Sequence, residues 1–420
     1  MQNLAAELKN RLPANLIVLI ETAGALAGER GENLYLVGGA VRDLLLGKTG
    51  FDLDLVVEGD GISLAQALAE RQAISLTRHP HFGTAKLRGE DWSLDITSAR
   101  RESYAHPGVL PTVAPGSLQD DLYRRDYTVN AMALGLNSGH RGELIDYYGG
   151  QADLAARRLR VLHEQSFSDD ATRIWRGLRY EQRLGFEFEE NTRRLLLRDM
   201  ARLETISGDR IRYELECIFR ETQPEKVIAR AGEMGALQQV HPKLSGNGWL
   251  AERYQSLRQQ TNPKLPPMSH YLALLAYNLS ADDVHQLVAF LKLAKPVDRV
   301  LRDTLTVKAR LRKLAYPTLK PSHIYQLLQD VSPAAVTVAA LATSSLLARQ
   351  HLSNYLKHYR YVKPSLNGDD LVRLGVAPGP QVKAILEQLL AAKLDGKAAT
   401  RAGQEMLARV LLESHHPPSG

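Results

Sequence analysis

The period of the hydrophobic pattern changes once along this chain, and that change limits the possible folds. Between about Leu34 and Leu144, apolar residues recur in short alternating segments with helical segments between them. From about Gln151 to the end they recur at helical spacing, interrupted mainly by prolines. Alternation is typical of strands with one buried face, and a three-to-four-residue spacing is typical of amphipathic helices. The pattern predicts an α+β fold, in which a strand-rich head with a mixed sheet precedes an all-α remainder.

At 420 residues the chain is too long for one hydrophobic core. We divide it into N-terminal helices at 1–30, a head at 31–150, a neck at 151–215, a body at 216–320 and a tail at 321–420. Within the head, the clearest helical patterns lie at 62–72 and 126–136.

Two carboxylates and two glycines in the head point to phosphate chemistry. In the segment FDLDLV, Asp52 and Asp54 are two residues apart, so in a strand they share a face while Leu53 and Leu55 point into the core. Two like charges on one face favour a divalent cation, which prefers oxygen ligands. Just upstream, Gly38 and Gly39 let the backbone approach a phosphate closely. These residues predict a metal-dependent nucleotide site.

A second alternating segment, at 92–98, supplies a candidate third carboxylate. Leu94 and Ile96 fall on one face, whereas Asp95 and Thr97 fall on the other. Asp95 could therefore meet Asp52 and Asp54 across a sheet and help hold two Mg²⁺ ions. The alternative for Asp95 is a capping or salt-bridging role.

Composition narrows the class of protein further. No apolar run approaches the length of a membrane span, and the N-terminus lacks the apolar core of a secretory signal, so we expect a cytoplasmic protein without a membrane partner. A single cysteine, Cys217, excludes an internal disulfide and is expected to be a buried structural thiol. Residues 301–420 hold 16 Lys and Arg against 8 Asp and Glu, which favours a grip on a phosphate backbone or else a solvated helical surface.

The motifs taken together resemble a known family. LVGGAVRD (36–43) followed by DLD resembles the nucleotidyltransferase superfamily related to DNA polymerase beta. RRDYTVNAMAL (124–134), DDATRIWRGLRYEQRLGF (169–186) and the segment 368–397 resemble class II tRNA nucleotidyltransferases and bacterial poly(A) polymerases. The resemblance implies a polymerase-beta-like catalytic head, a neck that selects the nucleotide base and a helical tail that binds RNA.

The resemblance also assigns roles to particular residues. Asp170 and Arg173, expected side by side on one helix, would select CTP and ATP. The other nucleotide-binding residues would be Gly38, Gly39 and Arg42 at the triphosphate, Arg124, Asp126 and Asn130 at the sugar and phosphates, and Arg176 and Arg179. With Arg173 and Arg183 these two form a basic stripe at helical spacing, which suits a triphosphate or tRNA or else is a solvated helix face. For Asp126 and Asn130 the alternative is helix N-capping.

Two further features bear on this resemblance. Asp169 stands where the family usually has Glu, so any capping or anchoring role of that position is in doubt. The segment 101–121, rich in proline and glycine, is expected to be a mobile loop, and a loop here helps the resembled enzymes switch from C to A addition.

The function implied is that of a CCA-adding tRNA nucleotidyltransferase. It would transfer CMP and then AMP, from CTP and ATP, to the 3′ acceptor end of tRNA with Mg²⁺ held by Asp52 and Asp54. The alternatives are an enzyme that adds only A or only CC, a poly(A) polymerase, and a catalytically silent RNA-binding protein.

Overall fold

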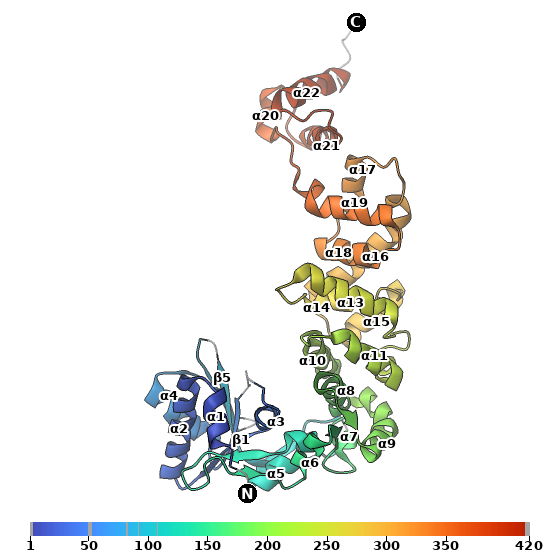
Figure 1. Cartoon of the computed structure of the whole chain (residues 1–420). Helices are drawn as coiled ribbons and strands as arrows, with labels where there is room; N and C mark the ends of the chain where they lie inside the picture. The colour runs from blue at the N-terminus through green and yellow to red at the C-terminus, as the bar shows by residue number, and fades with distance from the viewer. Residues whose placement is uncertain (1–2, 49–52, 81–82, 91, 107, 416–420) are drawn as a thin grey trace. The chain divides into compact units, whose positions relative to one another are not determined.

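The computed structural model describes residues 3–48, 53–80, 83–90, 92–106 and 108–415. They form two compact units, 1–242 and 243–420 (Figure 1). The α+β prediction is confirmed, because the described strands all lie in the first unit and the second is helical. The five-part division of the chain remains a prediction.

The first unit is built on a mixed sheet. Its described strands run in the order β3 (Ser75–His79), β4 (Thr84–Arg88), β5 (Ser93–Ser98), β2 (Leu53–Glu58), β1 (Asn33–Val37), β8 (Ala133–Gly135) and β9 (Leu144–Ile145). Only β2 and β5 pair in parallel among these neighbours. Between them the chain forms helix α4 (Gly61–Gln72) and then strands β3 and β4, and α4 matches the predicted helix at 62–72.

The two faces of this sheet differ in what covers them. Helices α1 (Ala5–Arg11), α2 (Ala14–Glu29) and α4 pack on one face, where they share an apolar core with Leu53 and Leu55 (Figure 1). The other face has a smaller apolar core, formed with helix α5 (Leu118–Tyr123) and centred on Tyr35, Val37 and Val56. Because the strand side chains alternate, Asp54 lies on this second face.

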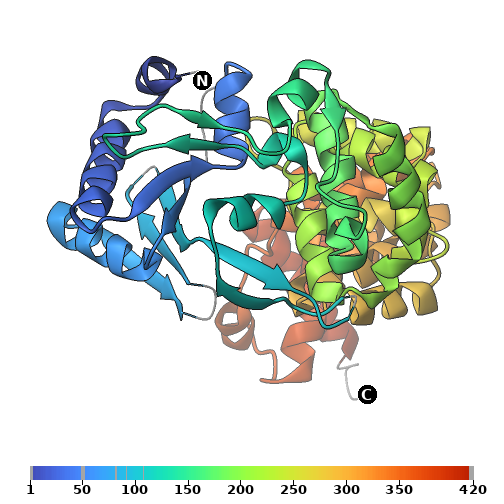
Figure 2. The ribbon, with the colours of Figure 1, turned by 90° about the horizontal axis from the view of Figure 1, so that it is seen from below.

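Two sequence-based expectations in the head are wrong. The segment 126–136 is a 3-10 turn, Thr128–Asn130, followed by strand β8, rather than a helix. Residues 101–121 are largely ordered: β6 (Arg100–Ser103) pairs antiparallel with β7 (Thr112–Pro115), and α5 follows. A Cβ on Gly108 at the tip of this ribbon would lie 2.5 Å from the Thr205 carbonyl oxygen, so the ribbon reaches the helices that follow residue 150 (Figure 2).

Helices complete the first unit after residue 150. They are α6 (Gly150–Ala155), α7 (Ser166–Asp169), α8 (Thr172–Leu184), α9 (Glu190–Asp199), η3 (Met200–Thr205), α10 (Gly208–Phe219), α11 (Pro224–Met234) and α12 (Ala236–Val240). Two short parallel strands, β10 (Arg158–Leu159) and β11 (Glu187–Phe188), bracket α8. Gly177 of α8 leaves room for the ring of Tyr127, whose hydroxyl a Cβ there would overlap, and this fixes α8 closely against the head.

The second unit contains α13 (Gly248–Thr261), α14 (Met268–Leu275), α15 (Ala281–Phe290), α16 (Lys295–Leu314), α17 (Pro321–Leu328), α18 (Pro333–Ala342), α19 (Leu346–Lys357), η4 (Tyr359–Tyr361), α20 (Gly368–Arg373), α21 (Pro380–Leu394) and α22 (Arg401–His415). One apolar core runs from Val307 to Tyr355 and another from Leu366 to Ala408. Pro321 and Pro333 occupy first turns of helices, where proline is tolerated, so they start helices within the first of these cores.

Candidate active site

A cavity of about 900 Å³ in the first unit lies between the sheet, α3 (Gly39–Leu45), the β6–β7 ribbon and helices α8 and α10. It gathers most of the residues that the sequence predicts at the site: Gly38, Gly39, Arg42, Asp54, Arg124, Asp126, Asn130, Asp170, Arg173, Arg176, Arg179 and Arg183. Asp52 lies outside the described residues. Asp95 is not part of the cavity wall.

The turn at Gly38 and Gly39 is shaped by Arg125, which is not among the predicted site residues. Gly38 has a φ of 75°, and a Cβ on it would lie 2.7 Å from Nη1 of Arg125. Only glycine suits both the conformation and the contact. Arg125 in turn donates to the buried carboxylate of Asp121 at 2.9 Å, which holds the guanidinium against the turn.

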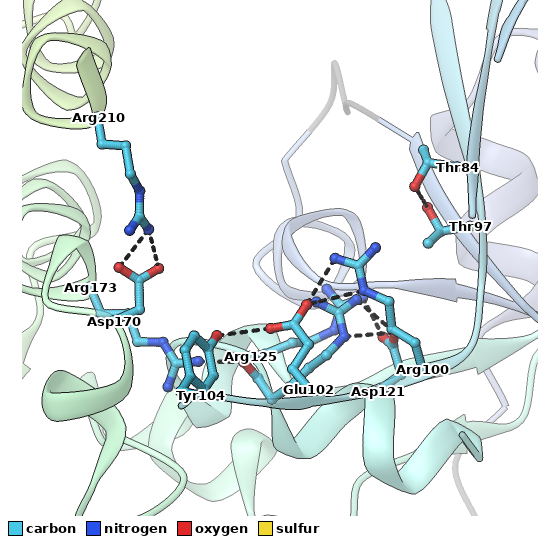
Figure 3. Close-up of polar contacts among 11 residues, drawn as sticks. Thr84, Thr97, Arg100, Glu102, Tyr104, Asp121, Arg125, Asp170, Arg173 and Arg210 are labelled. Atoms are coloured by element: carbon cyan, nitrogen blue, oxygen red, sulfur yellow. Dashed lines mark hydrogen bonds and ion pairs between the residues drawn. The ribbon is translucent and has the colours of Figure 1, made fainter. Parts of the chain in front are cut away.

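Of the three predicted catalytic carboxylates, the two within the described residues lie side by side. Asp54 and Asp95 are register partners on the parallel strands β2 and β5, so both project from the same face of the sheet. Asp54 is exposed, whereas Asp95 accepts a bond of 3.0 Å from Nζ of Lys86 on β4. On the same face Thr84 and Thr97 contact each other through their hydroxyls at 3.2 Å (Figure 3). The described residues contain no group of three or more His, Cys, Asp or Glu that could hold a metal ion.

Arg42, expected at the triphosphate, is only 3 % exposed. Its Nε and Nη2 each donate to Asp43 at 2.9 Å, and its Nη1 donates to Oδ1 of Asn130. Asn130 donates to Asp126 at 2.9 Å. The described contacts of Arg42 therefore link the glycine-turn helix α3 to the segment that carries Asp126.

Asp126 is the centre of a buried polar cluster. Its carboxylate accepts bonds from the Tyr127 backbone N–H at 2.8 Å and from Nε and Nη2 of Arg176 at 2.8 and 2.6 Å. Burial alone would raise the pKa of this carboxyl, but Arg176 and Asn130 hold it well below its usual range. Neither Asp126 nor Asn130 caps the 3-10 turn at 128–130, so the N-capping alternative is wrong.

Two arginines of the α8 stripe and Arg42 of α3 lie around one aromatic ring. The guanidinium carbons of Arg179, Arg42 and Arg176 lie 4.9, 5.5 and 5.7 Å from the centre of the Tyr180 ring. Arg179 also pairs with Glu221 at 3.3 Å, and Arg183 approaches Asp43 at 3.9 Å. The stripe thus forms a positive wall of the cavity whose members also bind acidic side chains of the protein.

The predicted base-selecting pair has a different geometry from the one expected. Asp170 is not on a helix with Arg173; it has extended backbone, with a φ of −142°, between α7 and α8. Its carboxylate pairs with Arg210 of α10 (Figure 3). Arg173 instead donates to the Ser166 hydroxyl and to the Arg124 carbonyl, both at 2.6 Å. Both side chains still line the cavity.

The β6–β7 ribbon contributes a cluster that the sequence analysis missed. Glu102 accepts bonds from Arg100 at 2.9 Å, from Arg124 at 3.2 Å and from the Tyr104 hydroxyl at 2.9 Å (Figure 3). Burial and the Glu102 charge raise the pKa of Tyr104, which keeps its hydroxyl protonated. In the sequence, the only signal of this cluster is an acid that follows two arginines in the segment RRES (100–103).

Helix α10 closes the cavity with Asp209, Arg210, Tyr213, Glu214 and Cys217. Burial raises the pKa of the Glu214 carboxyl, and Arg176 and Arg179 oppose that rise. Cys217 is partly exposed and lies on the cavity wall, so the expectation of a buried thiol is wrong.

Comparison with known proteins places this geometry in a family. The family described as "Poly A polymerase head domain" matches residues 34–160, and the one described as "Probable RNA and SrmB- binding site of polymerase A" matches residues 185–246. A protein of Halalkalibacterium halodurans named A-adding tRNA nucleotidyltransferase is 31% identical over 99% of this chain and 97% of its own length.

The chain belongs to the tRNA nucleotidyltransferase family. A relative from Geobacter sulfurreducens, also named A-adding tRNA nucleotidyltransferase, is 35% identical over 97% of this chain, which spans only 48% of that protein. A Deinococcus radiodurans relative, 32% identical over 89% of this chain and 87% of its own length, is named CC-adding tRNA nucleotidyltransferase.

Solved structures of the family agree with the fold. One described as "The structure of CCA-adding enzyme apo form II" has a TM-score of 0.83 and 31% identity over 98% of this chain and 99% of that chain. The Thermotoga maritima CCA-adding enzyme complexed with tRNA has a TM-score of 0.78 and 30% identity, over 98% and 99% of the two chains. Within the described residues, no helix is long and apolar enough to cross a membrane.

Proposed function

We propose that this tRNA nucleotidyltransferase transfers AMP from ATP to the 3′ hydroxyl of a tRNA that ends in CC, with release of pyrophosphate. The observation that carries the proposal is that one cavity holds both the exposed carboxylate of Asp54 and the Asp170–Arg173 pair. A nucleotide whose base contacts the pair can extend across the arginines of α8 toward the sheet.

The residues divide into three roles. Arg176 and Arg179 supply positive charge for the triphosphate, and Gly38 and Gly39 let the backbone approach it. Arg42 and Asn130 hold this wall in place, because their hydrogen bonds join α3 to Asp126. Asp170 and Arg173 contact the base, and Arg124 supports Arg173 through its carbonyl oxygen.

A divalent cation fits the sheet face. Asp54 presents a carboxylate on the cavity wall, Asp95 is its register partner, and hard cations prefer oxygen donors of this kind. We propose that Asp52 and Asp54 hold Mg²⁺, with Asp95 as a further carboxylate on the same face. When bound, Mg²⁺ would stabilise the charge that develops on the transferring phosphoryl group.

We propose tRNA as the polynucleotide partner and the second unit as part of its binding surface. The surplus of Lys and Arg in residues 301–420 suits contact with a phosphate backbone. A relative solved as a complex with tRNA supports this choice of partner.

A second candidate, complete CCA addition, is favoured by the solved CCA-adding enzymes that match nearly the whole chain. We rank addition of A alone above complete addition, because the Geobacter and Halalkalibacterium relatives described above are named A-adding enzymes. AMP transfer to a CC end is common to both candidates.

The test uses three transcripts of one tRNA, ending at the discriminator base, after the first C and after CC. Each is incubated with Mg²⁺ and with ATP alone, CTP alone or both nucleotides, one of them labelled, and product lengths are read on a gel. Addition of one A to the CC transcript alone is expected for an A-adding enzyme, whereas extension of all three to CCA indicates complete addition.

Two other results would contradict the proposal. Growth by many A residues would indicate a poly(A) polymerase. No incorporation on any transcript, together with retained RNA binding, would indicate a catalytically silent RNA-binding protein.

A further inference from the structure

We propose that Arg210 is a positioning residue that sets base selectivity by holding the Asp170 carboxylate in one orientation. The inference rests on the proposed function, in which Asp170 contacts the base. It assigns a selectivity role to helix α10, which lies outside the motif that carries Asp170.

The contacts of Asp170 are unevenly shared between its two oxygens. Oδ1 accepts from the Thr172 backbone N–H at 3.0 Å, from the Thr172 hydroxyl at 2.7 Å and from Nη2 of Arg210 at 2.7 Å. Oδ2 accepts from the same Nη2 at 2.7 Å. A carboxylate oxygen offers about two acceptor sites, so Oδ1 is saturated and Oδ2 has one site left.

That single open site matches one class of base. The exocyclic amines of cytosine and adenine donate N–H bonds, whereas uracil and guanine present a carbonyl oxygen at the corresponding position. An ionised carboxylate can only accept, so Oδ2 favours the amino bases and repels the keto bases. Arg210 fixes the direction of this open site, because its Nη2 contacts both oxygens of the carboxylate at 2.7 Å.

The described contacts that hold Arg173 in position do not involve Arg210. Its guanidinium is anchored by Ser166 and by the Arg124 carbonyl, and its side chain is buried. Loss of Arg210 should therefore release Asp170 while leaving Arg173 in place.

The neighbouring Asp169 does not compete for Arg210. Its described ion-pair contact is with Nε2 of His163 at 4.0 Å, and burial raises the pKa of its carboxyl.

Removal of Arg210 should change selectivity in a specific direction. Without it, Oδ2 loses its described donor, and the carboxylate keeps only the two Thr172 contacts at Oδ1. The open acceptor site is then no longer held in one direction toward the amino group of the base. Discrimination between amino and keto nucleotides should fall.

The test compares Arg210→Ala and Arg210→Lys with Arg212→Ala. Arg212 is a matched control, because it lies on the same helix, its side chain is 28% exposed like that of Arg210, and it pairs with Asp209 and Glu216 without itself lining the cavity. Two measurements are made on each protein: binding of ATP, CTP, GTP and UTP without RNA by calorimetry, and kcat/KM for each nucleotide on the tRNA transcripts.

We expect Arg210→Ala to reduce the preference for ATP and CTP over GTP and UTP by about tenfold or more in both measurements. Arg210→Lys should restore part of it, and Arg212→Ala should stay within about twofold of the unmodified chain. A purely structural role would instead lower the rate for all four nucleotides equally.

The inference is overturned if Arg210→Ala keeps the full preference, if Arg212→Ala loses as much, or if the unmodified chain binds all four nucleotides alike. A chain that binds ATP or CTP selectively but extends no RNA would contradict the proposed function alone. The binding measurement then still decides the role of Arg210.

Discussion

The two walls of the cavity are built on opposite physical plans. The sheet wall carries one described carboxylate, that of Asp54, and this side chain is exposed. The α8 wall carries arginines tied to acids around a buried centre at Asp126, which is 6 % exposed. Substitutions on the sheet wall should therefore lower nucleotide incorporation at little cost in folding stability. Substitutions on the α8 wall should lower both incorporation and folding stability.

The largest expected effect is on the sheet wall. Asp54→Asn should lower nucleotide incorporation by about a thousandfold or more, because it removes a charged oxygen ligand from the proposed metal site. Its melting temperature should remain unchanged, since the side chain is exposed. Single-turnover incorporation and thermal unfolding measure the two quantities. A large drop in melting temperature would remove the contrast between the walls.

The α8 wall should respond in stability. Asp126→Ala leaves the Tyr127 N–H, Asn130 and Arg176 without their acceptor and should cost about 3 kcal/mol in the free energy of unfolding, measured with urea. Asp126→Asn keeps the shape and some hydrogen bonds, so it should lose less. Equal stability of Asp126→Ala and the unmodified chain would show that the cluster is not structural.

The Asp126 cluster also gives a pH dependence with a definite sign. The folded-state pKa of Asp126 lies below its unfolded value, so its ionisation stabilises the fold above about pH 4 and this contribution is lost as the pH falls. The stability difference between the unmodified chain and Asp126→Asn should therefore narrow as the pH is lowered below that value. A difference that stays constant from neutral pH to pH 3 would contradict this.

Asp95 tests whether the register partner of Asp54 also takes part in the chemistry. If it acts with Asp54, Asp95→Asn should lower incorporation by about a hundredfold without changing the KM for ATP, because charge near the metal acts on the transition state. Steady-state kinetics separates the two parameters. A loss below about threefold would assign Asp95 to its ion pair with Lys86 instead.

The smallest expected effect concerns Lys86. Its ion pair with Asp95 is about 30% exposed on both sides, so Lys86→Met should change the free energy of unfolding by less than about 1 kcal/mol. Incorporation should stay within a few-fold if Asp95 serves a metal site rather than this pair. A loss as large as that of Asp95→Asn would mean that the pair itself is the functional unit.

Local patterns in the sequence predicted much of the fold. Alternation placed Leu53 and Leu55 in the core with Asp54 on the opposite face, and helical spacing found α4. The same reasoning wrongly predicted a helix across residues 131–134, because these residues are fully buried on both sides. A doubly buried strand has no polar alternation to distinguish it from a helix.

The site was predictable only as far as its motifs extend. The motifs gave the cavity residues, but not that Arg173 bonds to Ser166 and the Arg124 carbonyl or that Asp170 bonds to Arg210. Those partners are distant in sequence and are chosen by tertiary packing. Glu102 and Arg125 were missed for the same reason, since a charged residue in a loop-like segment has no local signature of its partner.

The strand order has a consequence for synthesis on the ribosome. The interior strand β1, Asn33–Val37, is hydrogen-bonded on one side to β2 and on the other to β8, Ala133–Gly135, which is made almost a hundred residues later. At typical elongation rates that interval is about 5 to 20 s. During it β1 has an unpaired edge in the middle of what will become the sheet, so the nascent head is most open to aggregation or chaperone capture just before β8 emerges.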